Sequence, residues 1–271
     1  MLGIAATKSR SHTPRVAGAQ PLPVPCSRVK GRLGQRKVSL LSEHFFTSDQ
    51  ELASALAAAT AAKLREALAA RSKASLVVSG GRTPADFLNA LSAHELDWSA
   101  VSVLPTDDRW VDANHADNNE AMIRRHLLQG AAATAVLSGL SDASLTPVPD
   151  GERQAEAALK KLSTPLDVVV LGMGDDGHTA SLFPQAPQLA QALDLNSGRS
   201  CMILDPVTAP HRRISLTLPA LLQSRQIDIL IRGDSKLNVY RRALSAGPTV
   251  GMPISFILHQ KQVPVHVYWS P

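Results

Sequence analysis

A short β-branched run that leads directly into a glycine-rich loop is the feature that most limits how this chain can fold. Residues 167–171 (DVVVL) predict a buried strand, because apolar β-branched runs bounded by turn residues pack well in a parallel sheet. Glycines at positions 172, 174 and 177 then allow a sharp turn. The turn places Asp176 and His178 at the carboxyl end of the strand, where open α/β sheets bind their ligands.

A carboxylate two residues from an imidazole is a candidate catalytic pair. Asp176 can hold the tautomer of His178 and leave the second ring nitrogen free as a general base. A lone histidine in a loop is more often structural, but the adjacent carboxylate and the three glycines favour the catalytic interpretation. We therefore predict that His178 and Asp176 are catalytic residues.

Similar apolar runs alternate with helix-forming segments along the rest of the chain. Predicted strands span 75–79, 101–104, 136–139, 201–204, 213–217, 227–231 and 263–269. Predicted helices span 48–70, 84–93, 118–129, 151–162 and 233–244, with a short one from 219. This alternation predicts an α/β fold with an open, mainly parallel sheet and helices on both faces, in a single catalytic domain over residues 41–271. Pro264 suggests that the last strand lies at an edge of the sheet.

The net charge of +5 is unevenly distributed. Residues 1–41 hold eight of the 28 Lys and Arg and no Asp or Glu, so the remainder carries 20 basic against 23 acidic residues. A mildly acidic body gives no support for nucleic-acid binding, and no apolar run is long enough to span a bilayer. The two cysteines, Cys26 and Cys201, suggest neither a disulfide framework nor a zinc cluster.

Residues 1–40 form a basic segment rich in Pro, Ser, Ala and Arg. Such a composition rarely buries enough apolar surface to offset the entropy of ordering, so we expect a disordered extension. An organelle transit peptide or a misassigned upstream start are the alternatives, but no amphipathic helix is evident. We expect the protein to be cytoplasmic.

The turn between the strand at 75–79 and the next helix is a candidate phosphate site. Backbone N–H groups at a helix N-terminus and nearby hydroxyls bind anions, and glycines allow a close approach. A tight turn that binds nothing is the alternative. Arg213 and Lys236 also lie near strand ends and could supply the cationic partners. The predicted phosphate-binding residues are Ser79, Gly80, Gly81, Arg82, Thr83, Arg213 and Lys236.

Asp107 and Arg109 directly follow another predicted strand. At the carboxyl edge of a parallel sheet Asp107 could position a hydroxyl or water, and Arg109 could neutralise a phosphate or carboxylate. A solvated loop is the alternative. Asp107, Asp176 and His178 match no zinc signature, so we expect no metal and no cofactor.

Together these motifs resemble the 6-phosphogluconolactonases, esterases of the pentose phosphate pathway. The resemblance covers residues 45–271 and rests on the segments 79–84, 107–110, 117–120, 172–184, 213–219 and 233–236. It implies a sugar-phosphate isomerase/deaminase-like fold and metal-independent hydrolysis of 6-phospho-D-glucono-1,5-lactone to 6-phospho-D-gluconate. His178 would be the general base, with Asp176, Asp107 and Arg109 in the catalytic group. We expect a monomer or weak homodimer that acts on this small-molecule sugar-phosphate lactone.

Three positions depart from the family pattern, and they bear on phosphate affinity and fine geometry. Asp108 stands where the family usually has Glu, Thr208 where Lys is common, and Leu222 where Asn is frequent. A glucosamine-6-phosphate deaminase is the nearest alternative, but its pattern continues to Ala-Phe-Asn-Glu-Pro, whose carboxylate is missing from residues 180–184. A non-catalytic sugar-phosphate sensor is the second alternative, but the basic N-terminal segment lacks a helix-turn-helix pattern.

Overall fold

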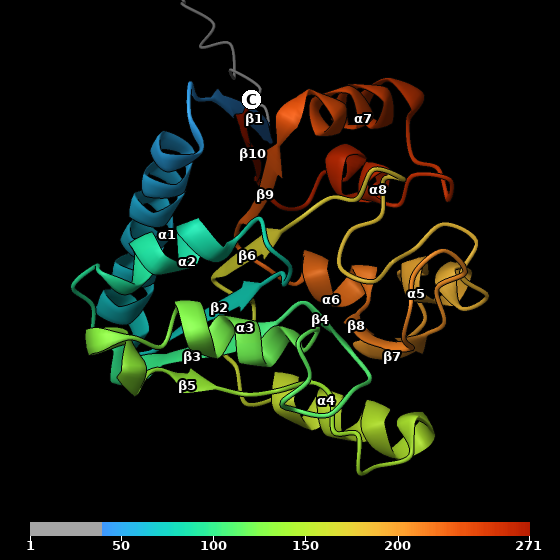
Figure 1. The fold of residues 1–271 in the computed structure, drawn as a ribbon, viewed down its shortest axis with the longest axis horizontal. Helices are drawn as coiled ribbons and strands as arrows, with labels where there is room; N and C mark the ends of the chain where they lie inside the picture. The colour runs from blue at the N-terminus through green and yellow to red at the C-terminus, as the bar shows by residue number, and fades with distance from the viewer. Residues whose placement is uncertain (1–39) are drawn as a thin grey trace, which may run out of the picture. The chain divides into compact units, whose positions relative to one another are not determined.

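The computed structural model describes residues 40–271, which belong to one compact unit. Its centre is a seven-stranded sheet in the order β1-β10-β9-β6-β2-β3-β5, with every neighbouring pair parallel (Figure 1). The strands are β1 (Leu41–Phe45), β2 (Ala74–Val78), β3 (Val101–Pro105), β5 (Val136–Leu137), β6 (Val168–Leu171), β9 (Ile227–Arg232) and β10 (Val265–Ser270). The predicted open parallel sheet is confirmed.

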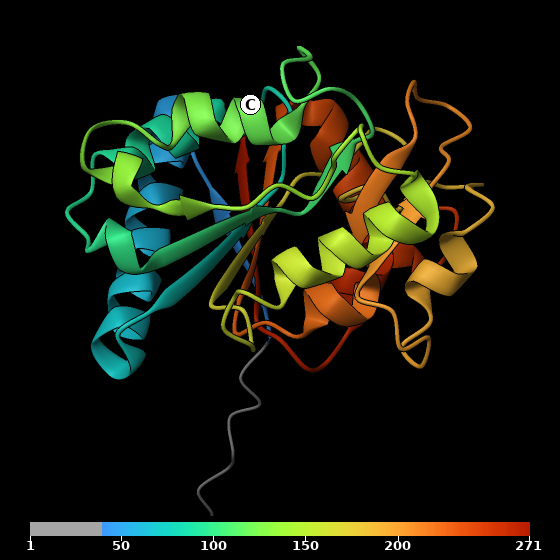
Figure 2. The same cartoon turned by 90° about the horizontal axis from the view of Figure 1, so that it is seen from below.

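Helices cover both faces of this sheet, as predicted (Figure 2). Alternate residues of each strand point to opposite sides, so Val78 packs in the core with α1, α2 and α3 while Val77 packs in the core with α4, α6, α7 and α8. The helices are α1 (Asp49–Arg71), α2 (Ala85–Ser92), α3 (Asn119–His126), α4 (Glu152–Leu159), α5 (Leu189–Leu193), α6 (Leu218–Leu222), α7 (Gly233–Ala246) and α8 (Ile254–His259). The sequence patterns did not predict α5 and α8.

The longest of the described helices, α1, begins and ends within one residue of the predicted bounds, 48 and 70. The Ser48 hydroxyl accepts a hydrogen bond from the N–H of Glu51 at 3.2 Å, which satisfies one of the free donors of the first turn. Asp49 and Glu51 in the first turn and Arg71 in the last complement the helix dipole.

A second, antiparallel sheet of three strands lies beside the carboxyl ends of the parallel strands. Its order is β4-β8-β7, formed by β4 (Asp107–Arg109), β8 (Arg213–Leu216) and β7 (Cys201–Leu204). The register places Asp107 opposite Ser215 and Arg109 opposite Arg213. The sequence patterns predicted two of these strands but not their separate sheet.

The predicted edge position of the last strand is wrong, because β10 lies between β1 and β9. Pro264 precedes the strand instead of interrupting its ladder, and its carbonyl accepts a hydrogen bond from the N–H of Ile227 at 3.0 Å. The first donor of β10, the N–H of Val265, bonds the carbonyl of Leu40. The edge strand β1 escaped prediction because its half-buried, partly polar sequence carries no apolar run.

Other expectations are only partly covered by the described residues. The predicted basic extension, residues 1–40, lies outside them apart from its last residue, and so does Cys26. Cys201 is a free, buried thiol in β7. Within residues 40–271, none of the helices combines the length and the apolar character needed to cross a membrane.

Candidate active site

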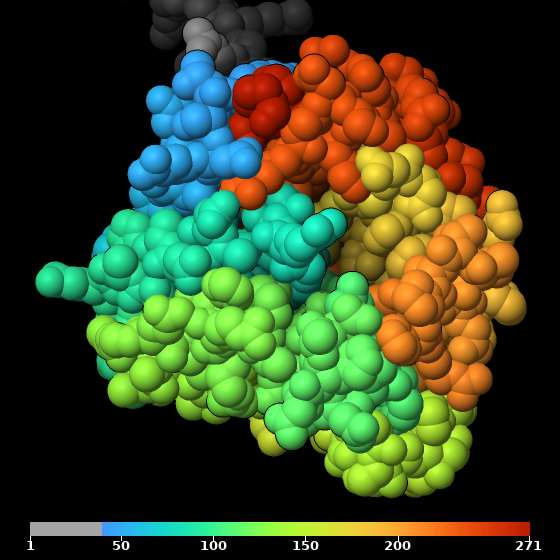
Figure 3. All heavy atoms as spheres, viewed as in Figure 1, coloured from blue at the N-terminus to red at the C-terminus, as the bar shows by residue number. Residues whose placement is uncertain are grey.

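A pocket of about 430 Å³ opens at the carboxyl ends of the parallel strands, next to the small sheet. Figure 3 shows the recess between the green, yellow and orange parts of the surface. Nine of the eleven predicted site residues line it: Ser79, Gly80, Gly81, Thr83, Asp107, Arg109, His178, Arg213 and Lys236. The other two are Arg82, whose side chain is exposed outside the lining, and Asp176, which reaches the pocket through His178.

His178 and Asp176 form a hydrogen-bonded pair in the loop after β6. Nδ1 of His178 lies 2.6 Å from Oδ1 of Asp176, and the same oxygen accepts a hydrogen bond from the N–H of His178 at 3.0 Å. Burial raises the pKa of Asp176, but the hydrogen bonds and charge of His178 together outweigh it and lower that pKa. An ionised carboxylate only accepts, so Nδ1 is the donor, and in the neutral form of the ring Nε2 is left with its lone pair.

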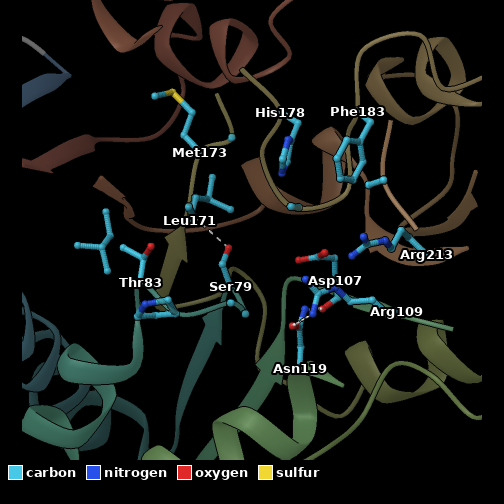
Figure 4. A pocket seen from close by; sticks show the side chains of 18 of the residues that line it. Ser79, Thr83, Asp107, Arg109, Asn119, Leu171, Met173, His178, Phe183 and Arg213 are labelled. Carbon is cyan, nitrogen blue, oxygen red and sulfur yellow. Dashed lines mark hydrogen bonds between the residues drawn. The ribbon is translucent and has the colours of Figure 1, made fainter. Parts of the chain in front are cut away.

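Two neighbours hold the imidazole ring in place. A Cβ atom on Gly174 would lie 2.1 Å from Nδ1 of His178, so a larger residue at position 174 would displace the ring. On the other side, the ring of Phe183 stacks on His178 with centroids 4.0 Å apart (Figure 4). The guanidinium of Arg213 lies 5.6 Å from the centroid of the Phe183 ring. Phe183 therefore connects His178 with Arg213, a role that the sequence analysis did not predict.

Asp107 is held by a chain of hydroxyl groups from three segments. Oδ2 accepts from the Ser181 hydroxyl at 2.6 Å and Oδ1 from the Thr106 hydroxyl at 2.8 Å. Since Thr106 donates to Asp107, the Ser79 hydroxyl 3.0 Å away must donate to Thr106, and it accepts from the N–H of Gly172 at 3.1 Å. The Ser79 hydroxyl thus ties the ends of β2 and β6 to Asp107, and Thr106 and Ser181 are site residues that sequence analysis missed.

Two arginines face the pocket from paired positions of β4 and β8. Nη1 of Arg109 donates to the carbonyl of Asp117 at 2.5 Å and to Oδ1 of Asn119 at 3.3 Å, and Nη2 of Arg213 donates to the carbonyl of Pro210 at 3.0 Å. The Nε atoms of both arginines are buried without a partner among the described residues. Burial, and next the positive charge of Arg109, lower the pKa of Arg213. This arrangement of buried cationic donors is suited to an anionic ligand.

The Gly-Gly turn after β2 packs closely against the start of α3. A Cβ atom on Gly80 would lie 1.9 Å from Oδ1 of Asn119, and Gly81 has a φ of +92°. The amide of Asn119 also donates to the carbonyl of Asp107 at 2.8 Å, so this side chain connects the turn with β4. From the first turns of α7, Nζ of Lys236 donates to the carbonyl of Met173 at 2.7 Å.

None of the three departures from the family pattern lines the pocket. Thr208 is exposed in the loop between β7 and β8, and Leu222 is buried at the end of α6. Asp108 is buried and accepts hydrogen bonds from the N–H groups of Arg109, Asn119 and Glu120, which caps α3. Burial raises the pKa of Asp108 to about 7 despite these hydrogen bonds.

The described residues contain one group whose atoms are close enough to hold a metal ion, and it does not include the predicted catalytic residues. His115, Asp117 and His211 place one ligand atom each within 4.8 Å of the others, at the rim of the pocket. Asp107, Asp176 and His178, the set weighed from the sequence, do not form such a group.

Comparisons with known proteins agree with this architecture. Residues 47–269 match the sequence profile of the family "Glucosamine-6-phosphate isomerases/6-phosphogluconolactonase". A protein of Pseudomonas aeruginosa named 6-phosphogluconolactonase is 45% identical over 229 residues, which cover 83% of this chain and 92% of that protein. The Pseudomonas putida protein of the same name is 43% identical over 228 residues, with 84% and 92% covered.

A crystal structure of a 6-phosphogluconolactonase from Shewanella baltica superposes with a TM-score of 0.80 at 43% identity, covering 85% of this chain and 98% of that one. A monomeric glucosamine-6-phosphate deaminase, 16% identical, shares the fold with a TM-score of 0.68. Family match, relatives and fold agree with the resemblance seen in the sequence motifs. The chain therefore belongs to the glucosamine-6-phosphate isomerase/6-phosphogluconolactonase family.

Proposed function

We propose that the protein hydrolyses 6-phospho-D-glucono-1,5-lactone to 6-phospho-D-gluconate in the oxidative pentose phosphate pathway. The observation that carries the proposal is the His178–Asp176 pair, joined at 2.6 Å and placed on a pocket lined by Arg109, Arg213 and Lys236. A base beside several cationic groups suits a substrate that combines a phosphate with a carbonyl that develops negative charge. The relatives named 6-phosphogluconolactonase support the same substrate.

In the proposed reaction, His178 acts as general base. With Nδ1 donating to Asp176, Nε2 takes a proton from a water molecule as the water oxygen bonds to C1 of the lactone. The carbonyl oxygen then carries the negative charge of the tetrahedral intermediate. When the bond from C1 to the ring oxygen breaks, His178 returns the proton to that oxygen. The products are a free hydroxyl and a carboxylic acid, which becomes the carboxylate by losing a proton to solvent.

We propose that the phosphate is bound by the turn from Ser79 to Thr83 with Arg213 and Lys236. Lys236 carries a point charge, and the buried Nε of Arg213 has no partner in the described part of the chain. Arg109 has an unpartnered Nε as well, and together with Asp107 it would orient the reacting end of the substrate. Ser79 has no free donor for the phosphate, because its hydroxyl donates to Thr106 and its N–H donates to the carbonyl of Val170 at 2.9 Å, so it would support the turn while the residues after it contact the phosphate.

The first test measures hydrolysis of freshly generated lactone with excess 6-phosphogluconate dehydrogenase and with EDTA present. We expect wild type to exceed spontaneous opening and His178→Ala to lose at least about 10²-fold in kcat. The variant His94→Ala, outside the pocket, is the matched control. A folded His178→Ala enzyme within a few-fold of wild type would exclude His178 as the base.

Asp176→Asn separates the tautomer argument from the presence of the ring. The carboxamide N–H of the variant can face Nδ1, which favours the tautomer with the proton on Nε2, where it cannot accept from water. We expect kcat to fall at least about tenfold with a smaller change in KM. Unchanged kcat would mean that Asp176 only supports the loop.

A second substrate distinguishes phosphate binding from stabilisation of the oxyanion. Glucono-1,5-lactone lacks the phosphate, so replacing a phosphate-binding residue lowers kcat/KM for the phosphorylated lactone alone. Replacing an oxyanion-stabilising residue lowers it for both lactones. We expect Arg213→Ala and Lys236→Ala to show the first pattern. Arg82→Ala tests whether that exposed residue takes part at all.

The two alternatives are measured in the same preparations. Release of ammonia from glucosamine 6-phosphate would favour a deaminase, although residues 180–184 lack the carboxylate of that pattern. Binding of 6-phosphogluconate by a folded wild-type protein that does not accelerate hydrolysis would favour a sensor.

A further inference from the structure

A cluster of two histidines and one aspartate lies at the rim of the pocket, outside the residues used in the proposed reaction. Nε2 of His211 is 3.3 Å and Nδ1 of His115 is 3.9 Å from the same oxygen, Oδ2 of Asp117. The two imidazole rings lie edge to face with centroids 5.3 Å apart. We infer that His115, Asp117 and His211 form a binding site for a divalent transition-metal ion such as Zn²⁺.

The distances are close to those of a metal site without its ion. Ligand atoms about 2.0–2.2 Å from a tetrahedral zinc ion lie about 3.3 Å from one another. The separation of His211 and Asp117 already has this value, and the three ligand atoms lie within 4.8 Å of each other. Both histidines are exposed and belong to loops. Their side chains can therefore move to shorten the distances that are still longer than in a zinc site.

The backbone of His211 supports the same interpretation. Its φ of +68° lies in the left-handed region, which residues other than glycine rarely adopt. This conformation occurs in the loop between β7 and β8, where it coincides with the contact between the imidazole and Asp117. A residue held in such a conformation at a cluster of ligating groups is a reason to look for a function there.

The surroundings select the class of ion. The charges of Arg109 and Arg213 border the cluster, and the guanidinium of Arg109 bonds the main-chain carbonyl of Asp117. Mg²⁺ and Ca²⁺ take six or more oxygen ligands, whereas this cluster offers one carboxylate beside two imidazoles. Imidazole ligands favour Zn²⁺, Co²⁺, Ni²⁺ or Cu²⁺. Coordination by Nδ1 of His115 would replace its present hydrogen bond from the N–H of Asp117, at 3.1 Å.

The site would connect the two loops that border the pocket. Asp117 and His211 both line it, the first just before α3 and the second two residues before Arg213. Three protein ligands leave a fourth position of a tetrahedral ion open, which would be available to water or an anionic oxygen. Bound metal would therefore hold the segments that carry Arg109 and Arg213 and add positive charge at the entrance.

The test titrates the full-length protein with ZnCl₂ at pH 7.5 by calorimetry and with CoCl₂ by visible absorption. We expect wild type to bind one ion that His115→Ala and His211→Ala each bind at least about tenfold more weakly, since even residues that only support metal ligands contribute that much. Asp117→Asn keeps the main-chain carbonyl used by Arg109 and should weaken binding in the same way. His94→Ala is the matched control and should bind like wild type.

Three further outcomes decide the proposal. Binding should weaken as the pH is lowered, because protons compete with the metal ion for the ligand atoms, and MgCl₂ should produce no signal. Wild type, His115→Ala and His211→Ala that titrate alike would overturn the proposal, because any bound ion would then lie elsewhere. The metal is measured directly, so the result is independent of whether the protein hydrolyses the lactone.

Discussion

Replacing Asp228 by asparagine isolates the cost of burying one carboxyl group in the sheet. Asp228 lies in β9 with no exposed surface, and its oxygens accept hydrogen bonds from Nε2 of Gln226 at 2.9 and 3.1 Å. Burial raises its pKa from 3.8 to about 7, more than the hydrogen bond from Gln226 and the charge of Lys63 lower it. The pocket lining does not include Asp228, so this prediction concerns stability alone.

The sign follows from proton uptake. Between pH 3.8 and about 7 the unfolded chain loses the Asp228 proton while the folded protein keeps it, so the free energy of unfolding falls as the pH rises. Above pH 7 the ionisation of Asp228 lowers the free energy of unfolding by about 4 kcal/mol, and below pH 3.8 this effect disappears. Asparagine has a similar shape and no charge, so it escapes this cost at every pH.

The assay is urea unfolding of wild type and Asp228→Asn at pH 5 and at pH 8. The free energy of unfolding of the variant, relative to wild type, should increase by about 3 kcal/mol between the two values. The pKa of His266, which burial lowers, adds an opposite trend to both proteins. A difference between the two proteins that is the same at both pH values would refute the reasoning.

Three further substitutions test contacts around the pocket. Gly80→Ala would place Cβ 1.9 Å from Oδ1 of Asn119. We therefore expect a loss of about 1–3 kcal/mol in the free energy of unfolding and a raised KM for the lactone. Unchanged values would mean that the Asn119 side chain moves aside without cost. Asp108→Ala leaves three N–H groups at the start of α3 without an acceptor and should lower the melting temperature by the equivalent of at least about 2 kcal/mol, which thermal unfolding measures. Thr106→Val removes a donor to Asp107. We expect kcat for the lactone to fall about tenfold, while circular dichroism shows an unchanged fold. A wild-type kcat would show that this hydrogen bond does not contribute to catalysis.

Local sequence determined most of the elements and the candidate catalytic pair. The run from Val168 to Leu171 is buried and forms a central strand, because its apolar side chains have no favourable alternative to a sheet covered on both faces. Asp176 and His178 are two residues apart, so the turn alone brings them within 2.6 Å. The motifs also carry enough information to identify the family without the sheet order.

Tertiary structure decided everything that depends on pairing between distant segments. Asp107 meets Ser181 across 74 positions of the sequence, and the register of β4 with β8 sets Arg109 opposite Arg213. The hydrophobic pattern of a strand reports only which faces are buried, not which strand lies beside it, and so Pro264 was taken as a sign of an edge. The same limit hid the rim cluster, whose ligands come from separate loops.

What the sequence by itself determined is therefore most of the strands and helices, without β1, β4, α5 and α8, together with the Asp176–His178 pair and the family. Only the folded protein determined the hydroxyl chain to Asp107, the stacking of Phe183 on His178 and the grouping of His115 with His211. The physical reason is the distance along the chain over which each kind of interaction acts. Backbone preference and periodicity act over a few residues, whereas sheet order, register and loop packing are settled by burial of the whole core.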